Sequence, residues 1–199
     1  GAASNDATLS LTFTSSEATT NFVTGDITVS NGAISSFNKT SSTVYTATFT
    51  PSGQGACTID VAAGKFTDAV GNTNSAASQF NWTFDSVKPT MVIKAAEVSD
   101  GAASNDATLS LTFTSSEATT NFVTGDITVS NGSISNFKST SSTVYTATFT
   151  PSGQGACTID VVAGKFTDAV GNTNSAAAQF NWTFDSAKPT MTITASQVS

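Results

Sequence analysis

Histidine and arginine are missing from this sequence, and its cations are limited to seven lysines. Charged residues make up 11% of the chain, and 14 acidic side chains give it a formal net charge of −7 at pH 7. Nucleic acids and anionic membranes attract clustered cations, so this balance argues against both as partners. An acidic surface with few counter-charges suits divalent cations, or serves solubility alone.

Groups for catalysis are equally scarce. Without histidine the commonest general base is missing, and a thiol nucleophile would have no imidazole to activate it. No pair of carboxylates stands out at an acid/base spacing in the sequence. We therefore expect no enzymatic activity and no catalytic residues.

Cysteine and long hydrophobic runs are also rare. The two cysteines, Cys57 and Cys157, are 100 positions apart. Cys57 shares one face of a predicted strand with Ile59 and Val61, so we expect its thiol to be a small buried hydrophobic group. No apolar run reaches about 18 residues, so we expect no membrane insertion by this segment.

One stretch makes up nearly the whole chain, because it is present twice. Residues 1–99 and 101–199 align at an offset of 100; 11 of these 99 pairs differ, which leaves 88 identical. A repeat of this length matches the size of one β-sandwich domain, so the chain should contain two tandem domains.

Hydrophobic residues in each copy alternate with a period of two, and no window shows a helical period. Turn signals separate the runs at intervals typical of a sandwich, and Asn31-Gly32 predicts a hairpin turn. We expect residues 1–6 to form a loop. Trp82 and Tyr45 lie on the apolar faces of their strands, so we expect them to be core residues and not a surface that stacks against sugars. We predict two packed antiparallel sheets per domain with Greek-key connections, from strands near residues 9–14, 26–30, 34–37, 45–50, 57–61, 80–84 and 91–93.

The last of these strands sets the predicted domain boundaries. If residues 91–93 open the second domain, the first spans 1–88 with its opening strand upstream, and the second spans 89–188. Residues 189–199 then form the opening strand of a following repeat. An unpaired edge strand can pair with another chain. The chain is therefore either a piece of a longer array or a subunit that joins other copies by strand exchange at 189–199.

Several segments, in the same order in both copies, resemble a known family. They are Thr-Phe-Thr-Ser-Ser-Glu-Ala at 12–18, Gly-Asp-Ile-Thr-Val at 25–29, Tyr-Thr-Ala-Thr-Phe-Thr-Pro at 45–51, Phe-Thr-Asp-Ala-Val-Gly-Asn at 66–72 and Trp-Thr-Phe-Asp at 82–85 leading to Lys-Pro-Thr at 88–90. The chain resembles the tandem bacterial Ig-like repeats of large cell-surface and biofilm adhesins.

The resemblance implies an all-β chain of two tandem Ig-like Greek-key β-sandwiches in an elongated array. It implies a non-catalytic structural spacer of an extracellular adhesin or surface filament, whose partners are neighbouring repeats of the same chain. The alternatives are an adhesive module that recognises a glycan or protein receptor of unknown identity, or a strand-exchange polymerising subunit.

The loop at 68–74 is the best candidate site, because its Asp and Asn oxygens and its glycine resemble loops that hold Ca²⁺. The alternative is that Asp68 and Asn72 close a tight turn by hydrogen bonds to the backbone. Any metal site here would borrow further ligands. The candidates are Glu17, Asp68, Asn72 and Asn74, and in the second copy Glu117, Asp168, Asn172 and Asn174. Asp85, Asp100 and Asp106 form a second candidate, which the resemblance to calcium-stiffened adhesin repeats favours.

Overall fold

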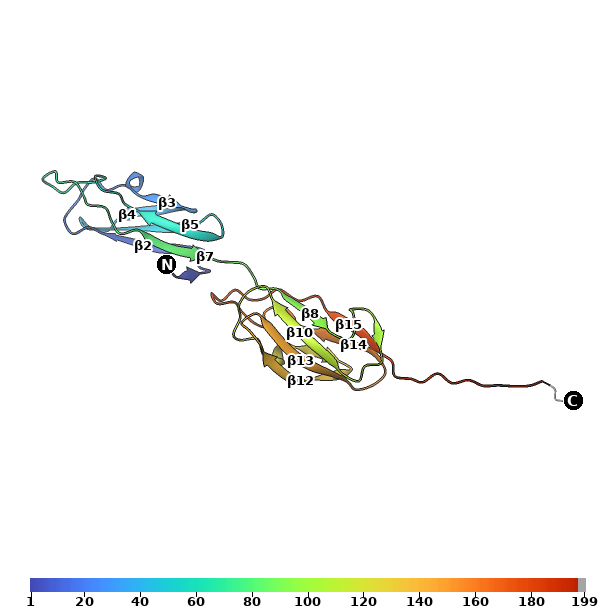
Figure 1. Ribbon diagram of the computed structural model, residues 1–199. Coiled ribbons are helices and arrows are strands. Elements are labelled where there is room, and N and C mark those ends of the chain that lie inside the picture. The colour runs from blue at the N-terminus through green and yellow to red at the C-terminus, as the bar shows by residue number, and fades with distance from the viewer. Residues whose placement is uncertain (197–199) are drawn as a thin grey trace. The chain divides into compact units, whose positions relative to one another are not determined.

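The computed structural model describes residues 1–196 and divides into two units, Gly1–Val87 and Lys88–Ser199 (Figure 1). Both units are built almost entirely from β-strands, with one short 3-10 turn each, η1 (Thr24–Asp26) and η2 (Thr124–Asp126). The predicted all-β class with two tandem domains is confirmed.

Unit 1 contains two sheets. One has the strand order β1-β7-β6-β3 and the other the order β2-β5-β4. Their strands are β1 (Ala3–Ser4), β2 (Leu9–Thr14), β3 (Thr28–Ser30), β4 (Gly32–Lys39), β5 (Val44–Pro51), β6 (Gly55–Asp60) and β7 (Phe80–Phe84).

Unit 2 repeats this arrangement with one additional strand. Its sheets have the orders β9-β15-β14-β11 and β12-β13-β10-β8. The strands are β8 (Met91–Ala95), β9 (Ala103–Ser104), β10 (Leu109–Ser115), β11 (Thr128–Ser130), β12 (Gly132–Ser139), β13 (Val144–Pro151), β14 (Gly155–Asp160) and β15 (Phe180–Phe184).

The core of each unit lies between its sheets and follows the predicted alternation. Along β5, Tyr45, Ala47 and Phe49 are buried while the residues between them are only partly covered. Phe49 meets Trp82 edge-to-face, with ring centroids 6.3 Å apart. The predictions that Tyr45 and Trp82 belong to the core are confirmed. Aromatic pairs of this kind add to the stabilisation that burial alone gives.

Both thiols are buried within the cores. Cys57 and Cys157 are fully buried and form no disulfide. Each sulfur contacts the Asn that follows the neighbouring strand of its sheet. In unit 1 this strand is β3, and Asn31 Nδ2 lies 3.6 Å from Cys57 Sγ. The expectation of a small buried hydrophobic group is confirmed, and burial raises the pKa of the Cys157 thiol despite hydrogen bonds from Phe184 and Asn131.

The predicted hairpin at Asn31-Gly32 is wrong. β3 pairs with β6 while β4 pairs with β5, so the chain crosses from one sheet to the other at this turn. Asn31 does adopt a positive φ of 51°, as the turn signal predicts. Gly32 is required by packing, because a Cβ there would lie 2.2 Å from the ring of Phe49.

Two further expectations are corrected. Residues 1–6 are not all loop, because Ala3–Ser4 forms β1 and pairs in parallel with β7, so the sheets are not wholly antiparallel. The strand expected at 26–30 begins only at Thr28. Asp26 instead ends the turn η1, where its Oδ2 accepts a hydrogen bond of 2.9 Å from the Val23 N–H.

The extra strand β8 distinguishes the two units. It pairs antiparallel with β10, from Met91 opposite Ser115 to Ala95 opposite Leu111. Among residues 1–196 no strand pairs with the corresponding edge of β2. The consequence is visible in identical residues: Leu109, Leu111 and Phe113 are fully buried, whereas their counterparts in β2 are only half-buried.

This difference gives a test in which each unit controls for the other. Leu111→Ala should destabilise unit 2 by about 2–5 kcal/mol, the usual range for a fully buried leucine. Leu11→Ala should destabilise unit 1 by less, because its side chain is already partly in water. Denaturant unfolding followed by Trp182 fluorescence in a Trp82→Phe background reads unit 2, and the reciprocal background reads unit 1. Equal losses in the two units would contradict this interpretation.

Candidate functional site

The loop at 68–74 forms the same tight turn in both units. Asp68 Oδ1 accepts hydrogen bonds from the N–H groups of Val70 (3.0 Å) and Asn72 (2.8 Å), and Oδ2 accepts one from the Asn72 side-chain amide (2.7 Å). Asp168 makes the same three contacts at 2.9, 2.9 and 2.8 Å. These contacts match the alternative prediction, in which Asp68 and Asn72 close a tight turn by hydrogen bonds to the backbone.

Asn74 is held by the backbone on both sides of its amide. Its Oδ1 accepts from the N–H groups of Lys65 (2.7 Å) and Phe66 (3.0 Å), and its Nδ2 donates to the Ala62 and Ser75 carbonyls, both at 2.8 Å. The equivalent Asn174 is 2% exposed and makes the same bonds. This side chain closes the base of the loop, and its oxygen is directed at the backbone.

Within unit 2 the structure brings together the carboxylates of two predicted ligands, Glu117 and Asp168. They offer oxygens within 4.8 Å of each other, although 51 positions separate them in the sequence. Asp168 is buried and Glu117 half-buried, whereas Glu17 in unit 1 is exposed. Asn172 turns its amide nitrogen, not its oxygen, toward Asp168. The geometry therefore presents carboxylates rather than amide oxygens.

Hydrogen bonding keeps these loop carboxylates ionised. Burial by itself raises the pKa of Asp168, but the bonds from Asn172, Val170 and Gly171 together outweigh it and leave the pKa below the ordinary value of 3.8. The pKa of Asp68 is lowered by the bonds from the side chain and backbone of Asn72. Each loop is therefore anionic at neutral pH.

The carboxylates of the second candidate have partners close to them in the fold. Asp100 Oδ1 accepts a hydrogen bond of 2.7 Å from the Asn181 N–H. Asp106 Oδ2 accepts one from the Ser104 hydroxyl. Asp85 Oδ1 accepts one of 3.1 Å from the Val87 N–H. Each of these bonds fixes a local turn or strand end.

A model of the bacterial Ig-like domain matches residues 1–84 and again residues 85–184. The chain belongs to the bacterial Ig-like domain family. The resemblance seen in the sequence is confirmed for both copies. No curated protein sequence matches the chain.

Solved structures similar to this Ig-like chain include several bacterial proteins. InvD of Yersinia pseudotuberculosis is 22% identical over 100% of this chain and 62% of its own, with a TM-score of 0.42. The Escherichia coli adhesin FdeC is 16% identical over 91% of this chain and 61% of its own, with a TM-score of 0.47. Invasin, described as a bacterial integrin-binding protein, is 16% identical over 80% of this chain and 32% of its own, with a TM-score of 0.38. The Ig-like chain thus spans less than two thirds of each, and its family assignment rests on the domain match.

No helix within residues 1–196 has both the length and the hydrophobicity needed to cross a bilayer.

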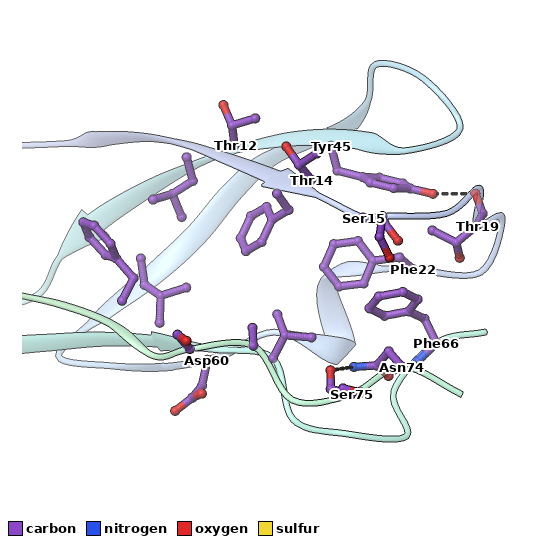
Figure 2. A pocket seen from close by; sticks show the side chains of 18 of the residues that line it. Thr12, Thr14, Ser15, Thr19, Phe22, Tyr45, Asp60, Phe66, Asn74 and Ser75 are labelled. Atoms are coloured by element: carbon purple, nitrogen blue, oxygen red, sulfur yellow. Dashed lines mark hydrogen bonds between the residues drawn. The ribbon is translucent and has the colours of Figure 1, made fainter. Parts of the chain in front are cut away.

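Sequence reasoning missed that the two Ig-like domains present different surfaces. Phe80 is 52% exposed, whereas the identical Phe180 is 4% exposed. Phe80 and Phe13 line an open groove in unit 1. Phe66, which is labelled in Figure 2, lines the same groove. In unit 2 the strand β8 pairs with β10, the counterpart of β2.

The lowered pKa of Asp168 predicts a pH-dependent stability of unit 2. A carboxyl whose folded pKa is depressed stabilises the native state above its unfolded value, 3.8, and this contribution disappears as the pH falls through the folded pKa. At pH 7, Asp168→Asn should lower the free energy of unfolding by about 1–2 kcal/mol, since charge-assisted hydrogen bonds are lost. The difference from the unmodified chain should shrink below pH 3.8.

Thermal unfolding between pH 2 and pH 7, followed by Trp182 fluorescence in the Trp82→Phe background, measures this effect. Asp68→Asn in the opposite background is the matched control and should have a smaller effect, because that loop is more exposed. A difference between Asp168→Asn and the unmodified chain that persists at pH 2 would contradict the assignment.

Proposed function

We propose that this chain is a non-catalytic structural spacer of an extracellular bacterial adhesin or surface filament. The observation that supports it best is the repetition of one independently organised Ig-like domain with almost no sequence change. A spacer requires length and mechanical resistance, and copying one domain supplies both. A receptor-binding or catalytic role would place its selectivity in side chains of one domain, yet 88 of 99 aligned positions are the same.

The topology of unit 2 supports resistance to force along the chain. The chain enters this unit through β8 and leaves it through β15, and these strands belong to different sheets. Tension at the two ends therefore pulls β8 along its own axis against β10. Because the hydrogen bonds of that ladder are perpendicular to the strands, they must break together rather than one at a time.

The distribution of aromatic residues favours a spacer over a glycan-binding module. Trp82, Tyr45 and their counterparts in unit 2 are buried in the cores. Phe22, Phe37 and Phe66 form one aromatic cluster with Tyr45. Its contacting rings, Phe22 with each of the other three and Phe37 with Tyr45, have centroids 5.1–5.7 Å apart. These rings contact one another and stabilise the fold.

Single-molecule stretching of the two-domain chain tests the mechanical role. Unit 2 should unfold at a higher force than unit 1, because β8 supplies a strand ladder to the force-bearing edge. Val92→Pro, which removes a backbone N–H from β8, should lower the force for unit 2. Equal unfolding forces for both domains would contradict the mechanical role of β8. Specific binding of the chain in a glycan and receptor screen would count against a pure spacer.

We also propose that unit 2 binds Ca²⁺ through Glu117 and Asp168. Two converging carboxylates are hard oxygen ligands, and their mutual repulsion would be relieved by a divalent cation. Ca²⁺ takes six to eight oxygens, so water or backbone carbonyls would complete the shell. Asn174 does not fit as a ligand, because its oxygen already accepts two backbone hydrogen bonds. The ion would neutralise the site and tie the segment after β10 to the 168–174 loop.

Metal removal tests this proposal directly. Millimolar Ca²⁺ should raise the melting temperature of unit 2 relative to EDTA, and Glu117→Gln should abolish the increase. Glu17→Gln is the matched control at the same position of unit 1, where the side chain is exposed, and should leave the calcium response of unit 2 intact. A melting temperature that is the same in EDTA and in calcium would rule out a structural role for the ion.

A further inference from the structure

The turns that follow β3 and β11 carry a pair of residues that is chemically unstable in water. In an Asn-Gly sequence the backbone nitrogen of the glycine can attack the side-chain amide carbon of the asparagine, because the glycine has no Cβ to block the approach. The sequence occurs twice in the chain, at Asn31-Gly32 and at Asn131-Gly132. Both asparagines have a φ of 51° and are half-buried.

Hydrogen bonds hold the side-chain amide of each asparagine. In unit 1, Asn31 Nδ2 donates to the Gly53 carbonyl at 2.8 Å and lies 3.6 Å from Cys57 Sγ. In unit 2, Asn131 Nδ2 donates to the Gly153 carbonyl, also at 2.8 Å. This amide nitrogen is the group that leaves when the glycine nitrogen attacks, so the native bonds fix both the leaving group and the carbon to which it is attached.

The backbone conformation turns the reacting atoms away from each other. At a φ of 51° a residue with a Cβ is confined to the left-handed region, where ψ is about +30 to +60°. The nitrogen of the next residue is then anti to Cβ about the Cα–C bond. The Gly32 nitrogen can therefore reach Asn31 Cγ only after a large rotation about that bond.

Contacts of the folded unit oppose this rotation. The Asn31 carbonyl accepts a hydrogen bond of 3.0 Å from the Ser52 N–H, and Gly32 is opposite Pro51 in the ladder of β4 and β5. A Cβ at Gly32 would lie 2.2 Å from the ring of Phe49, so this backbone is packed closely against the core. Rotation would break the hydrogen bond and displace the first residue of β4.

We propose that each Asn-Gly turn is a modification site that the fold keeps closed and that unfolding of its own unit opens. In the unfolded chain the Gly32 nitrogen attacks Asn31 Cγ and forms a new C–N bond, which closes a cyclic imide. The side-chain nitrogen leaves as ammonia and takes the proton of the glycine nitrogen. Water then adds to one of the two imide carbonyls and opens the ring, which gives either aspartate or isoaspartate.

Neither product fits the native turn. A carboxylate oxygen in place of Asn31 Nδ2 would face the Gly53 carbonyl oxygen, which lies 2.8 Å from that nitrogen, so repulsion would replace a hydrogen bond. In isoaspartate the backbone also runs through the side chain and gains an atom just before Gly32. The contact of Gly32 with Phe49 leaves no room there even for a Cβ. A unit that is modified while unfolded should therefore refold with lower stability.

The turn thus makes a permanent record of unfolding in each unit separately. Hydrolysis of the amide is not reversed when the unit refolds, and each unit contains one such turn. This inference concerns the chemistry of the turn and does not depend on the proposed spacer role.

Incubation of the unmodified chain at mildly alkaline pH, with and without denaturant, tests whether the fold closes the site. Peptide mass spectrometry measures the loss of each amide, and it distinguishes the two turns because Ala33 in one copy corresponds to Ser133 in the other. Conversion should be at least about 100-fold slower in the native chain, because stable domains expose such segments rarely. Equal rates with and without denaturant, or no conversion in denaturant, would overturn the proposal.

A variant studied only in denaturant tests the attacking atom, so its ability to fold does not matter. Gly132→Ala should slow the conversion of Asn131 several-fold, because the added Cβ hinders the glycine nitrogen. Asn31 in the same molecule is the matched control and should convert as before. An unchanged rate at Asn131 would show that the amide is lost by direct hydrolysis and would contradict the proposed step.

Refolding tests the effect of the modification. Chain that has been aged in denaturant is returned to native buffer, and unit 2 is then unfolded while Trp182 fluorescence is followed in the Trp82→Phe background. A population that unfolds at lower denaturant concentration should appear, with a share equal to the fraction of Asn131 converted. Asn131→Gly is the control, because glycine accepts a positive φ and has no amide to lose. A converted chain with unchanged stability, or an equal loss in aged Asn131→Gly, would contradict the turn as the site.

Discussion

The pairing of β8 with β10 is the contact on which the closure of an Ig-like core depends in this chain. Nearly identical sequences fold into both units, yet Phe180 is covered and Phe80 is largely exposed. In unit 2, Met91 and Ile93 of β8 complete the inner face of the sheet, and Val98, which follows this strand, is buried in the same core cluster as Phe180. Hydrophobic burial scales with the apolar area removed from water, so this segment changes the environment of a whole core face.

This dependence separates the sequence repeat from the folded domain. Gly1 and Gly101 are equivalent positions of the repeat, and the strand that closes unit 2 lies before Gly101. The family match assigns residue 85 onward to the second domain, and the boundary between the units falls at Val87. A domain that takes its first strand from the residues following the previous domain is joined to it by a short covalent connection.

The loop at 68–74 shows how few side chains can order a long connection. Between β6 and β7 there is no regular strand, and Asp68 with Asn74 holds the backbone by side-chain bonds. In unit 2 the same loop places the Asp168 carboxylate next to Glu117. Turn chemistry and a cation site use the same oxygen-rich residues, so one role does not exclude the other for Asp168, whereas for Asn174 the backbone bonds occupy the oxygen.

Much of the fold could be predicted because alternation is a local property. Residues such as Tyr45, Ala47 and Phe49 lie on one face of any strand that contains them, and a buried face must meet another apolar face. The pairing partners could not be predicted in this way. The Asn31-Gly32 signal specifies a turn conformation at Asn31, but the choice of partner strand depends on contacts distant in sequence.

The candidate site was likewise predictable only in part. The oxygen-rich composition of 68–74 was evident from the residues themselves, including the possibility that they close a turn. That Glu117 meets Asp168 while Asn174 turns toward the backbone follows from the packing of segments far apart in the chain. Sequence by itself determined the strands, their inward faces and the two-domain repeat, because these follow from the order of neighbouring residues. Only the tertiary structure decided which strands pair and which core stays open, because both depend on whether a distant segment occupies the edge of a sheet.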